Sequence, residues 1–434
     1  MKILIVGNGG REHTIAYMVF HSPSFQNTGS KLFCTTGNPG INSIAEPVDI
    51  KPADIGKILN YVKENEIGFT IVGPELPLSL GIADKFEENN LKIFGPSAKA
   101  AEIETSKVFA KDFMARNNIP TAEYQSFNSD EINSAKEFAL KLGFPVVVKA
   151  DGLAAGKGVI IVNDMIELQS VLIDFTVNKV FGESGINFVI EQFLQGFELS
   201  IFVITDGVHY KILPASQDHK KIGDNDTGKN TGGMGAYAPA DFLIDEKLWN
   251  KIESSVINPA IEGLRKEGRT YKGCLYCGLM ILTDSEGIKN PYVIEFNCRF
   301  GDPEAQAVLP LINSDFLELL KSSAENRISG YNLITGKSHA CCVVLASDGY
   351  PDKYETGKLI EGLDKTDDNC IIFHSGTKKS AEEVLTNGGR VLSVVGISDI
   401  SLKDAVQVSY KNVKKIHFEN KYFRKDIGRK GLIL

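Results

Sequence analysis

Short apolar runs alternate with segments of helical spacing over the first hundred residues, and this alternation constrains the fold more than any other feature. The runs are Lys2–Val6, Lys31–Thr35, Gly68–Val72 and Leu91–Phe94, and a glycine follows each of them within two residues. Strands that alternate with helices in this way form a mostly parallel sheet. We therefore predict an open parallel α/β domain at the N-terminus.

The rest of the chain divides where spacing and composition change. Residues 99–117 have the spacing of one long helix, and Pro120 follows soon after it. Because the residue before a proline prefers extended backbone, we place the first domain boundary there. At roughly 150 residues per domain, a length of 434 residues suggests several domains. A linker-like stretch at 329–337 precedes a last α/β unit.

Composition excludes several classes of protein. Apolar residues make up 43% and charged residues 24% of the chain, and the formal net charge is −8. A general nucleic-acid binder needs a basic field, and a membrane span needs about 20 apolar residues in a row. We therefore expect neither a nucleic-acid nor a membrane partner. With no export signal apparent, the seven cysteines favour a reducing cytoplasm.

Two of these cysteines form a lone CxxC at Cys274 and Cys277, inside the apolar run GCLYCGLMIL. A structural zinc site needs four ligands, and no second pair or nearby histidine follows in the sequence. Free cysteines are also among the most frequently buried residues. We interpret this pair as part of a hydrophobic core.

The turn after the first apolar run reads GNGGRE at positions 7–12. Backbone N–H groups at such a strand-to-helix turn can hold a phosphate. The dinucleotide fingerprint requires glycine or alanine where Glu12 stands, and Thr35-Thr36 lacks the acid that holds a ribose. The turn favours a phosphate or sugar-phosphate site, with a dinucleotide site and a plain tight turn as alternatives.

A second glycine-rich segment, Asp151–Gly158, follows Lys149. It differs from a phosphate-binding Walker loop, since three residues separate Gly152 from Gly156 and a glycine follows Lys157. It lies between two predicted strands, so we expect a hairpin-like flap that covers phosphates, with Lys149 in reach of them. A solvated surface hairpin is the alternative.

Acidic residues flank a short linker between strands at Glu191 and Glu198. The linker backbone has one C=O and one N–H that can meet the edge of an adenine, and the second acid can accept both ribose hydroxyls. Exposed acids at strand ends are the alternative interpretation.

Glu295 and Asn297 stand two residues apart in a predicted strand. Side chains with this spacing point to the same face of a strand. A carboxylate and an amide oxygen suit Mg²⁺, which takes few protein ligands together with phosphate oxygens. An ion-paired strand end is the alternative.

The stretch Gln217–Gly235 is rich in glycine and charge, and its composition predicts a long loop. A long loop in a compact enzyme is usually functional. We expect this one to surround a polar substrate. His219 lies within it, either as a base or, more commonly for a lone histidine, as a structural residue.

Taken together, these segments resemble the phosphoribosylamine–glycine ligases, or glycinamide ribonucleotide synthetases, of the ATP-grasp superfamily. The resemblance runs almost from end to end and rests on GNGGREH (7–13), IVGPE (71–75), IFGP (93–96), KADGLAAGKGV (149–159), SQDHK (216–220), NTGGMGAY (230–237), VIEFNCRFGDPE (293–304), TNGGRVL (386–392) and FRKDIG (423–428). Two departures are Lys229, where many relatives have proline, and Phe197, which is often acidic in relatives.

The resemblance implies an α/β and α+β multidomain architecture with an ATP-grasp fold. An N-terminal open parallel α/β domain (pre-ATP-grasp) would span 1–120, a small lid 121–193, a large antiparallel domain 194–328 and a C-terminal domain 329–434. ATP would lie between the lid and the large domain. We expect a cytoplasmic monomer.

The resemblance also implies the site residues. Catalytic roles would fall to Lys149, Asp218 and Arg299. ATP would be bound by Lys107, Lys149, Gly152, Gly156, Gly158, Glu191, Leu194 and Glu198. Phosphoribosylamine would face Gly9, Gly10 and Glu75, and glycine would lie near Asp218 and Arg299. Mg²⁺ or Mn²⁺ would be held by Glu295 and Asn297.

The activity implied is the ATP-dependent joining of glycine to 5-phosphoribosylamine through glycyl phosphate, which gives glycinamide ribonucleotide, ADP and phosphate in purine biosynthesis. Two other functions stay open from the sequence. One is another ATP-grasp carboxylate–amine ligase, against which the SQDHK and EFNCRFGDPE segments argue. The other is a nucleotide-binding oxidoreductase or sensor that uses the N-terminal domain, against which Glu12 and the Glu295–Asn297 pair argue.

Overall fold

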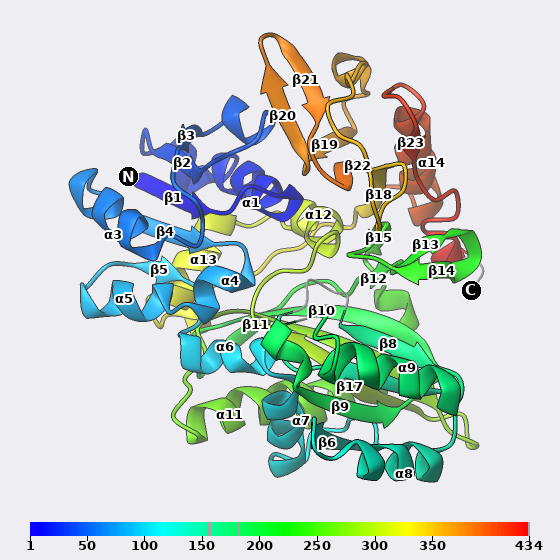
Figure 1. Cartoon of the computed structure of the whole chain (residues 1–434). Helices are drawn as coiled ribbons and strands as arrows, with labels where there is room; N and C mark the ends of the chain where they lie inside the picture. The colour runs from blue at the N-terminus through cyan, green and yellow to red at the C-terminus, as the bar shows by residue number, and fades with distance from the viewer. Residues whose placement is uncertain (154–157, 181, 433–434) are drawn as a thin grey trace.

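A parallel sheet at the N-terminus presents the glycine-rich turn at its edge. The computed structural model describes residues 1–153, 158–180 and 182–432. The sheet has the strand order β3-β2-β1-β4-β5 (Figure 1). Its elements are β1 (Lys2–Val6), α1 (Gly10–Phe20), α2 (Pro23–Gln26), β2 (Lys31–Thr35), β3 (Glu46–Val48), α3 (Ile55–Glu64), β4 (Phe69–Val72), α4 (Glu75–Ser79), α5 (Ile82–Glu88) and β5 (Ile93–Phe94). The predicted open parallel α/β domain is confirmed, and the turns after β1 and β4 meet at one edge of the sheet.

The single helix expected over 99–117 is wrong, because the structure breaks it at Ser106. Helix α6 (Ala98–Thr105) ends there, and α7 (Lys107–Arg116) begins at the next residue. Ser106 has an extended backbone, and its hydroxyl accepts the N–H of Phe109 at 3.0 Å. A serine at this position caps the new helix. The break directs Lys107 toward the cleft described below.

A small antiparallel sheet follows, with the order β6-β9-β7-β8. Its elements are β6 (Tyr124–Asn128), α8 (Ile132–Leu142), β7 (Val146–Ala150), β8 (Val159–Val162), α9 (Met165–Thr176) and β9 (Asn187–Gln192). Phe127, Phe138, Phe175 and Phe188 form much of its core. Strands β7 and β8 pair antiparallel on either side of the second glycine-rich segment, and Gly156 lies outside the described residues.

A larger antiparallel sheet has the order β11-β10-β16-β17. Its strands are β10 (Phe197–Thr205), β11 (Tyr210–Ile212), β16 (Gly273–Thr283) and β17 (Lys289–Asn297), and the helices of this region are α10 (Glu246–Ile252), α11 (Asn258–Lys266), α12 (Glu304–Val308) and α13 (Phe316–Ala324). Cys274 and Cys277 are buried on β16 as free thiols. No cluster of three or more metal-ligating acids, histidines or cysteines occurs among the described residues. The assignment of Cys274 and Cys277 to the hydrophobic core is confirmed.

The last sheet has the order β12-β15-β18-β22-β19, and β23 pairs with β18. It combines β12 (Gln217–Asp218) and β15 (Gly235–Ala238) with β18 (His339–Ser347), β19 (Cys370–His374), β22 (Arg390–Ser398) and β23 (Lys421–Tyr422). Helix α14 (Leu402–Val413) packs on it, and β20 (Thr377–Ser380) forms a hairpin with β21 (Glu383–Thr386). Because strands from both sides of residue 328 share this sheet, the boundary at that position stays a prediction.

The expected long loop at 217–235 contains short strands. Besides β12 and β15, it holds the hairpin of β13 (Lys221–Gly223) and β14 (Thr227–Asn230). These strands have two to four residues each and are mostly polar, so they lack the apolar alternation by which a strand is recognised. The polar stretch is therefore a folded part of the protein rather than a free loop.

The C-terminal sheet docks directly on the N-terminal domain. The backbone N–H of His374 in β19 donates to Nδ1 of His13 in α1 at 2.8 Å. Burial, with a smaller contribution from His374, lowers the pKa of His13 to about 3, which keeps its imidazole neutral.

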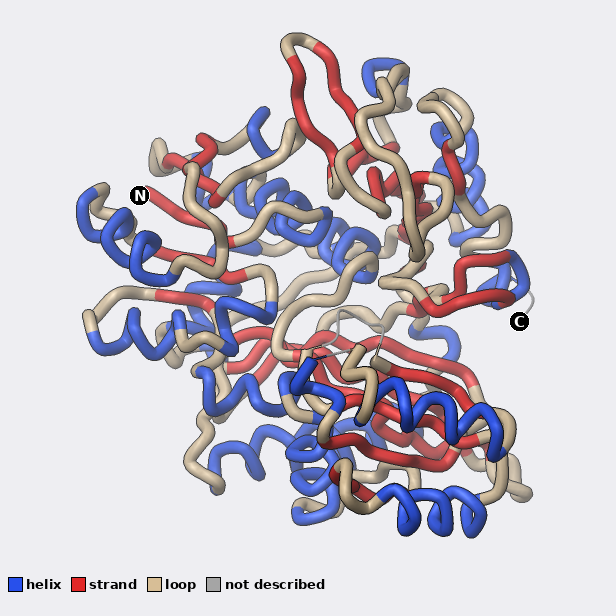
Figure 2. The backbone as a smooth tube through the Cα atoms, viewed as in Figure 1, coloured by secondary structure: helices blue, strands red, loops and turns tan. Residues whose placement is uncertain are grey.

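Figure 2 shows loops gathered in the middle of the molecule, between the upper and lower groups of strands. None of the helices in the described parts of the chain has the length and apolar character needed to cross a membrane.

Candidate active site

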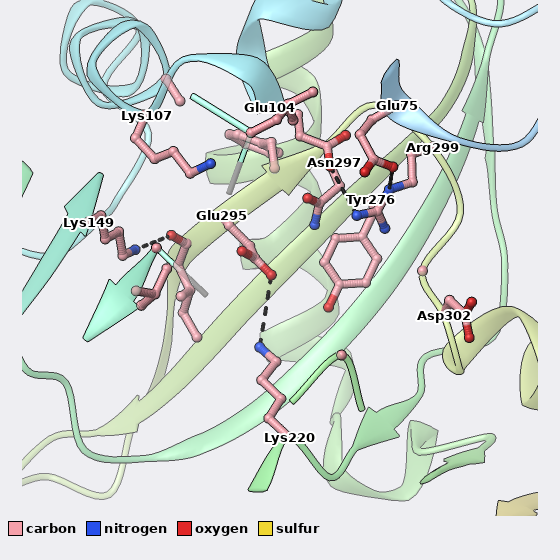
Figure 3. A pocket seen from close by; sticks show the side chains of 18 of the residues that line it. Glu75, Glu104, Lys107, Lys149, Lys220, Tyr276, Glu295, Asn297, Arg299 and Asp302 are labelled. Atoms are coloured by element: carbon pink, nitrogen blue, oxygen red, sulfur yellow. Dashed lines mark hydrogen bonds and ion pairs between the residues drawn. The ribbon is translucent and has the colours of Figure 1, made fainter. Parts of the chain in front are cut away.

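A cleft of about 440 Å³ lies between the N-terminal parallel sheet, the small and the large antiparallel sheets and the C-terminal sheet. Charged side chains from each of these regions line it. Figure 3 shows Lys107 and Lys149 on one side, Glu75 and Arg299 on the other, and Glu295 between them. The charged and amide side chains that line the cleft are Arg11, Glu75, Glu104, Lys107, Lys111, Lys149, Asp218, Lys220, Asn230, Glu295, Asn297, Arg299, Asp302, Glu304 and Arg390. Such a density of opposite charges suits a substrate with several phosphate groups.

Most residues predicted for the site come together here. Those that line the cleft are Glu75, Lys107, Lys149, Gly158, Asp218, Glu295, Asn297 and Arg299. Glu198 touches the lining through an ion pair with Lys220 at 3.0 Å. Five described residues of the prediction are not part of the lining: Gly9, Gly10, Gly152, Glu191 and Leu194. Gly156 lies outside the described residues, so its predicted role stays a prediction.

One end of the cleft has apolar walls and a pair of lysines. Ala110, Met114, Val159, Ile294 and Phe296 form part of these walls. A flat apolar base fits between such side chains. This end is therefore the part of the cleft best suited to a nucleoside.

The two lysines of this end are held by backbone oxygens. Lys107 donates to the carbonyl of Gly152 at 2.6 Å, and Lys149 donates to the carbonyl of Ile294 at 2.9 Å. Gly152 has a φ of +111°, a backbone conformation that glycine adopts most readily. Counting only contacts with described residues, Lys107 uses one of its three N–H donors here and Lys149 uses two, since it also pairs with Glu191. At least one donor of each ammonium can then meet a phosphate oxygen.

Glu295 and Asn297 lie on β17 with both side chains at the cleft. Burial alone would raise the pKa of Glu295, but Lys220 and Lys149 together hold that pKa below its ordinary value. The group is therefore an ionised carboxylate at neutral pH. One carboxylate beside one amide oxygen suits Mg²⁺ or Mn²⁺ when substrate phosphates complete the coordination. The donor set thus fits the implied metal.

Two further acids, Asp218 and Glu304, lie together at the floor of the cleft. Glu304 accepts a hydrogen bond from the hydroxyl of Tyr276 at 3.1 Å, whereas Oδ1 of Asp218 is buried and finds no hydrogen-bond partner among the described residues. Burial is the main cause that raises the pKa of both carboxyls, and the charge of Glu304 adds to it at Asp218. An unpartnered buried carboxyl oxygen is a strong acceptor for an ammonium ligand.

Arg299 forms the opposite wall. Its guanidinium binds Glu75 at 3.2 Å and Glu104 at 3.0 Å. Burial alone would raise the pKa of Glu75, but Arg299 and Arg11 lower it to about 2. Arg299 is therefore fixed by two carboxylates, and its Nη1 also donates to the carbonyl of Phe300 at 3.1 Å.

The side chain of Glu12 fills the hydrogen-bonding position of the glycine-rich turn. The N–H of Gly9 donates to Oε2 of Glu12 at 2.7 Å, so Glu12 accepts a hydrogen bond that a phosphate would otherwise receive. Gly10 packs on the C-terminal region, since a Cβ added there would lie 2.4 Å from Oγ of Ser375 and 2.8 Å from Nε2 of Gln306. The predicted phosphate site at this turn is therefore occupied by a carboxylate in this structure.

Several functional candidates escaped the sequence analysis. They are Glu104, Lys111, Lys220, Tyr276, Glu304 and Arg390. Three of them lie inside quoted motifs: Lys220 in SQDHK, Glu304 in EFNCRFGDPE and Arg390 in TNGGRVL. Lys111 stands four residues after Lys107 on α7, a spacing that places both on one side of the helix. Position within a motif and helical spacing were therefore the signals by which these four residues could have been found in the sequence.

Two residues singled out in the sequence have other surroundings. His219 is fully buried away from the cleft lining, and burial lowers its pKa to about 3. This supports the structural interpretation over a role as a base. Lys229, which departs from the family pattern, is exposed and pairs with Asp352 at 2.7 Å. It does not line the cleft.

Comparison with family models assigns nearly the whole chain. The model for "Phosphoribosylglycinamide synthetase, N domain" matches residues 1–104, the ATP-grasp (A) domain model matches 105–305, and the C domain model matches 340–430. Together the matched regions leave only short segments at 306–339 and at the C-terminal end unassigned. They confirm the predicted ATP-grasp fold and the order of its parts.

Individual relatives of the chain belong to the same family as the matching models. The chain is 44% identical over 428 residues to a phosphoribosylamine–glycine ligase of Caldanaerobacter subterraneus subsp. tengcongensis, with 99% of each chain covered. It is similar to the crystal structure of the phosphoribosylamine–glycine ligase of Thermotoga maritima, with a TM-score of 0.80, 31% identity and 98% and 100% coverage. A biotin carboxylase of Campylobacter jejuni shares the fold alone, with a TM-score of 0.73, 16% identity and 97% and 92% coverage.

Proposed function

The chain belongs to the phosphoribosylglycinamide synthetase family, and we propose from this that its cleft joins glycine to 5-phosphoribosylamine with ATP as the co-substrate. The products are glycinamide ribonucleotide, ADP and phosphate, which places the reaction in purine biosynthesis. The observation that carries the proposal is the cleft itself. It combines lysines for phosphates, the Glu295–Asn297 pair for a metal and Arg299 for an anion within one space.

ATP would occupy the end of the cleft with apolar walls. Adenine would lie between Met114 and Phe296, with the backbone from Glu191 to Leu194 at its edge. Glu198, at the start of β10, would accept the ribose hydroxyls in place of its present partner Lys220. Lys107, Lys149 and the flap residues Gly152, Gly156 and Gly158 would meet the phosphates.

Glu295 and Asn297 would hold Mg²⁺ or Mn²⁺, which when bound offsets the charge of the phosphates. Three lysines of this chain supply positive charge around the Glu295–Asn297 pair. Lys220 lies 3.9 Å from Glu295, and Lys107 and Lys149 line the same space. Fixed charges of this kind stabilise the charge that develops on a transferring phosphoryl group.

Glycine would bind between Asp218 and Arg299. The buried Oδ1 of Asp218, which has no hydrogen-bond partner in the part of the chain that the structure describes, would accept the ammonium of glycine, and Arg299 would orient its carboxylate. A carboxylate oxygen of glycine then attacks the γ-phosphorus, the bond to the β–γ bridging oxygen breaks, and ADP leaves. Binding and orientation of the two reactants is the main contribution of these side chains.

The second step joins the two substrates. The amine of phosphoribosylamine, held near Glu75 and the Gly9-Gly10 turn, attacks the carbonyl carbon of glycyl phosphate. The amine loses a proton, and phosphate leaves with the glycine oxygen that formed the acyl phosphate. Acyl phosphates hydrolyse in water, so the small lid domain predicted at 121–193 would close over the cleft during this step. We further propose that the enzyme is a cytoplasmic monomer.

Oxygen transfer tests this sequence of steps. Glycine carrying ¹⁸O in its carboxylate is supplied with ATP and phosphoribosylamine, and the phosphate released is analysed by mass spectrometry. The proposal predicts that each phosphate carries one glycine oxygen and that its amount matches that of glycinamide ribonucleotide. Unlabelled phosphate would mean that water attacks ATP and would contradict the acyl phosphate route.

A further inference from the structure

At the nucleotide end, two lysines that line the cleft share one buried carboxylate. Glu191 forms ion pairs with Lys149, at 2.5 Å, and with Lys111. The exposed fractions of Lys111, Lys149 and Glu191 are 2%, 4% and 4%. The three side chains form a buried cluster of charges, and Lys111 has no assigned role in the proposed reaction.

The backbone brings the three side chains to one face of the small sheet. Val147 of β7 stands opposite Glu191 of β9, so Lys149, two residues further, points to the same face diagonally across from Glu191. Helix α7 covers this face and supplies Lys111. The ammonium of Lys111 also donates to Oγ1 of Thr121 at 2.6 Å, which fixes its position.

The charges of this cluster decide how much positive charge Lys149 can offer. Two ammonium groups face one carboxylate, so these three side chains together carry one positive charge beside the phosphate-binding part of the cleft, where Glu295 also interacts with Lys149. If Lys111 were absent, Glu191 would belong to Lys149 alone and would balance its charge. In a buried site such a pair interacts strongly, because water screens it little.

We propose that Lys111 is a positioning residue for ATP: by occupying one oxygen of Glu191, it leaves Lys149 with an unbalanced charge for the phosphates. This inference rests on the proposed function, since it assumes that Lys149 meets ATP. Lys111 itself acts through Glu191. Its own ammonium is taken up by Glu191 and Thr121.

The test compares Lys111→Met with the double variant Lys111→Met/Glu191→Gln. The single variant leaves Glu191 to neutralise Lys149, so the KM for ATP should rise about tenfold while the KM for glycine changes by less than about twofold. In the double variant, the uncharged amide that replaces the carboxylate of Glu191 cannot neutralise Lys149. The KM for ATP should then return to within about threefold of the parent value, although a second buried residue has been changed.

Further variants keep the test decisive. Lys247→Met removes an exposed lysine on α10 and should leave every KM unchanged. Lys111→Arg retains the charge and should retain most of the affinity for ATP. If the methionine variants fail to fold, Lys111→Gln with and without Glu191→Gln provides the same comparison at similar volume.

Two results would overturn the inference. One is a KM for ATP in Lys111→Met equal to that of the parent. The other is a double variant that folds, by its melting temperature, yet binds ATP no better than the single variant, because that pattern indicates a packing role. Failure of the proposed function would be distinct, since the parent protein itself would then release no ADP with glycine and phosphoribosylamine.

Discussion

The ammonium of Lys220 lies 3.9 Å from the carboxylate of Glu295, the acid that we assign to the metal. Lys220 also pairs with Glu198, the acid assigned to the ribose, at 3.0 Å. One lysine therefore links the two acids that ATP and its metal are proposed to use. If ATP binds as proposed, we expect Lys220 to exchange these two partners for phosphate oxygens.

Replacing Glu295 by glutamine tests the metal assignment, because the change removes the charge and keeps the shape. A charge-assisted contact in a water-excluded site is worth about 3 kcal/mol, or about a hundredfold in rate. We expect turnover of Glu295→Gln to fall by about that factor, and added Mg²⁺ or Mn²⁺ to restore part of it. The measurements are ADP release against metal concentration and the melting temperature. A variant that melts earlier, turns over within about threefold of the parent and ignores metal would show that Glu295 serves only ion pairs.

The close approach of Gly10 to the C-terminal region predicts a measurable cost for any side chain there. A Cβ at Gly10 would stand 2.4 Å from Oγ of Ser375, nearer than atoms in contact can approach. We expect Gly10→Ala to lower the melting temperature by several degrees and to raise the KM for phosphoribosylamine. Adding Ser375→Gly should recover part of the melting temperature.

The matched control for Gly10 is Gly56→Ala. Gly56 lies in α3, and a Cβ added there would meet no atom within 4 Å. Alanine in a helix is more favourable than glycine, so this variant should melt at the parent temperature or slightly above it. Equal melting of Gly10→Ala and Gly56→Ala would contradict the close packing of α1 on the C-terminal region.

The ion pairs of Glu75 predict a pH-dependent contribution to stability. Its pKa is lowered from 4.5 to about 2, where burial opposes the change and Arg299 and Arg11 cause it. A group with a depressed pKa in the folded state stabilises the protein above its unfolded pKa, and this contribution is lost as pH falls toward the folded pKa. The melting temperature of Glu75→Gln should therefore lie below that of the parent at pH near 6, and the difference should shrink below pH of about 4.

The control for Glu75 is Glu286→Gln, which changes an exposed acid in the turn between β16 and β17. Its melting temperature should follow that of the parent at every pH. A difference between parent and Glu75→Gln that is independent of pH would contradict the assignment, because it would indicate lost packing rather than lost ion pairs.

Much of the fold was accessible from the sequence because its signals are local. The strands β1 and β2 follow from apolar runs, and their bounds agree with those predicted from the sequence. The break at Ser106 was missed because serine is tolerated inside helices, and only its cap to Phe109 reveals the helix start. The hairpin of β13 and β14 was missed because its residues are polar.

Residues of the site could be predicted where side chains of suitable chemistry stand close together in one sequence motif. Glu295 and Asn297 share a strand, so their spacing alone places them together at the cleft. Lys111 and Glu191 are far apart in sequence, and their ion pair depends on how α7 crosses the small sheet. The turn at Gly9 was expected to present a free N–H, but three residues later Glu12 takes that hydrogen bond itself. Contacts of this kind are set by tertiary packing, which the local pattern does not contain.

Release of ADP by the purified protein tests the central claim most directly. ATP, Mg²⁺, glycine and freshly generated 5-phosphoribosylamine are supplied together, and each is then omitted in turn, with D-alanine, bicarbonate or aspartate offered in place of glycine. The proposed function predicts that ADP forms only when glycine and phosphoribosylamine are both present, in an amount equal to the glycinamide ribonucleotide formed. Robust ADP release with one of the substitutes, and none with glycine, would contradict it.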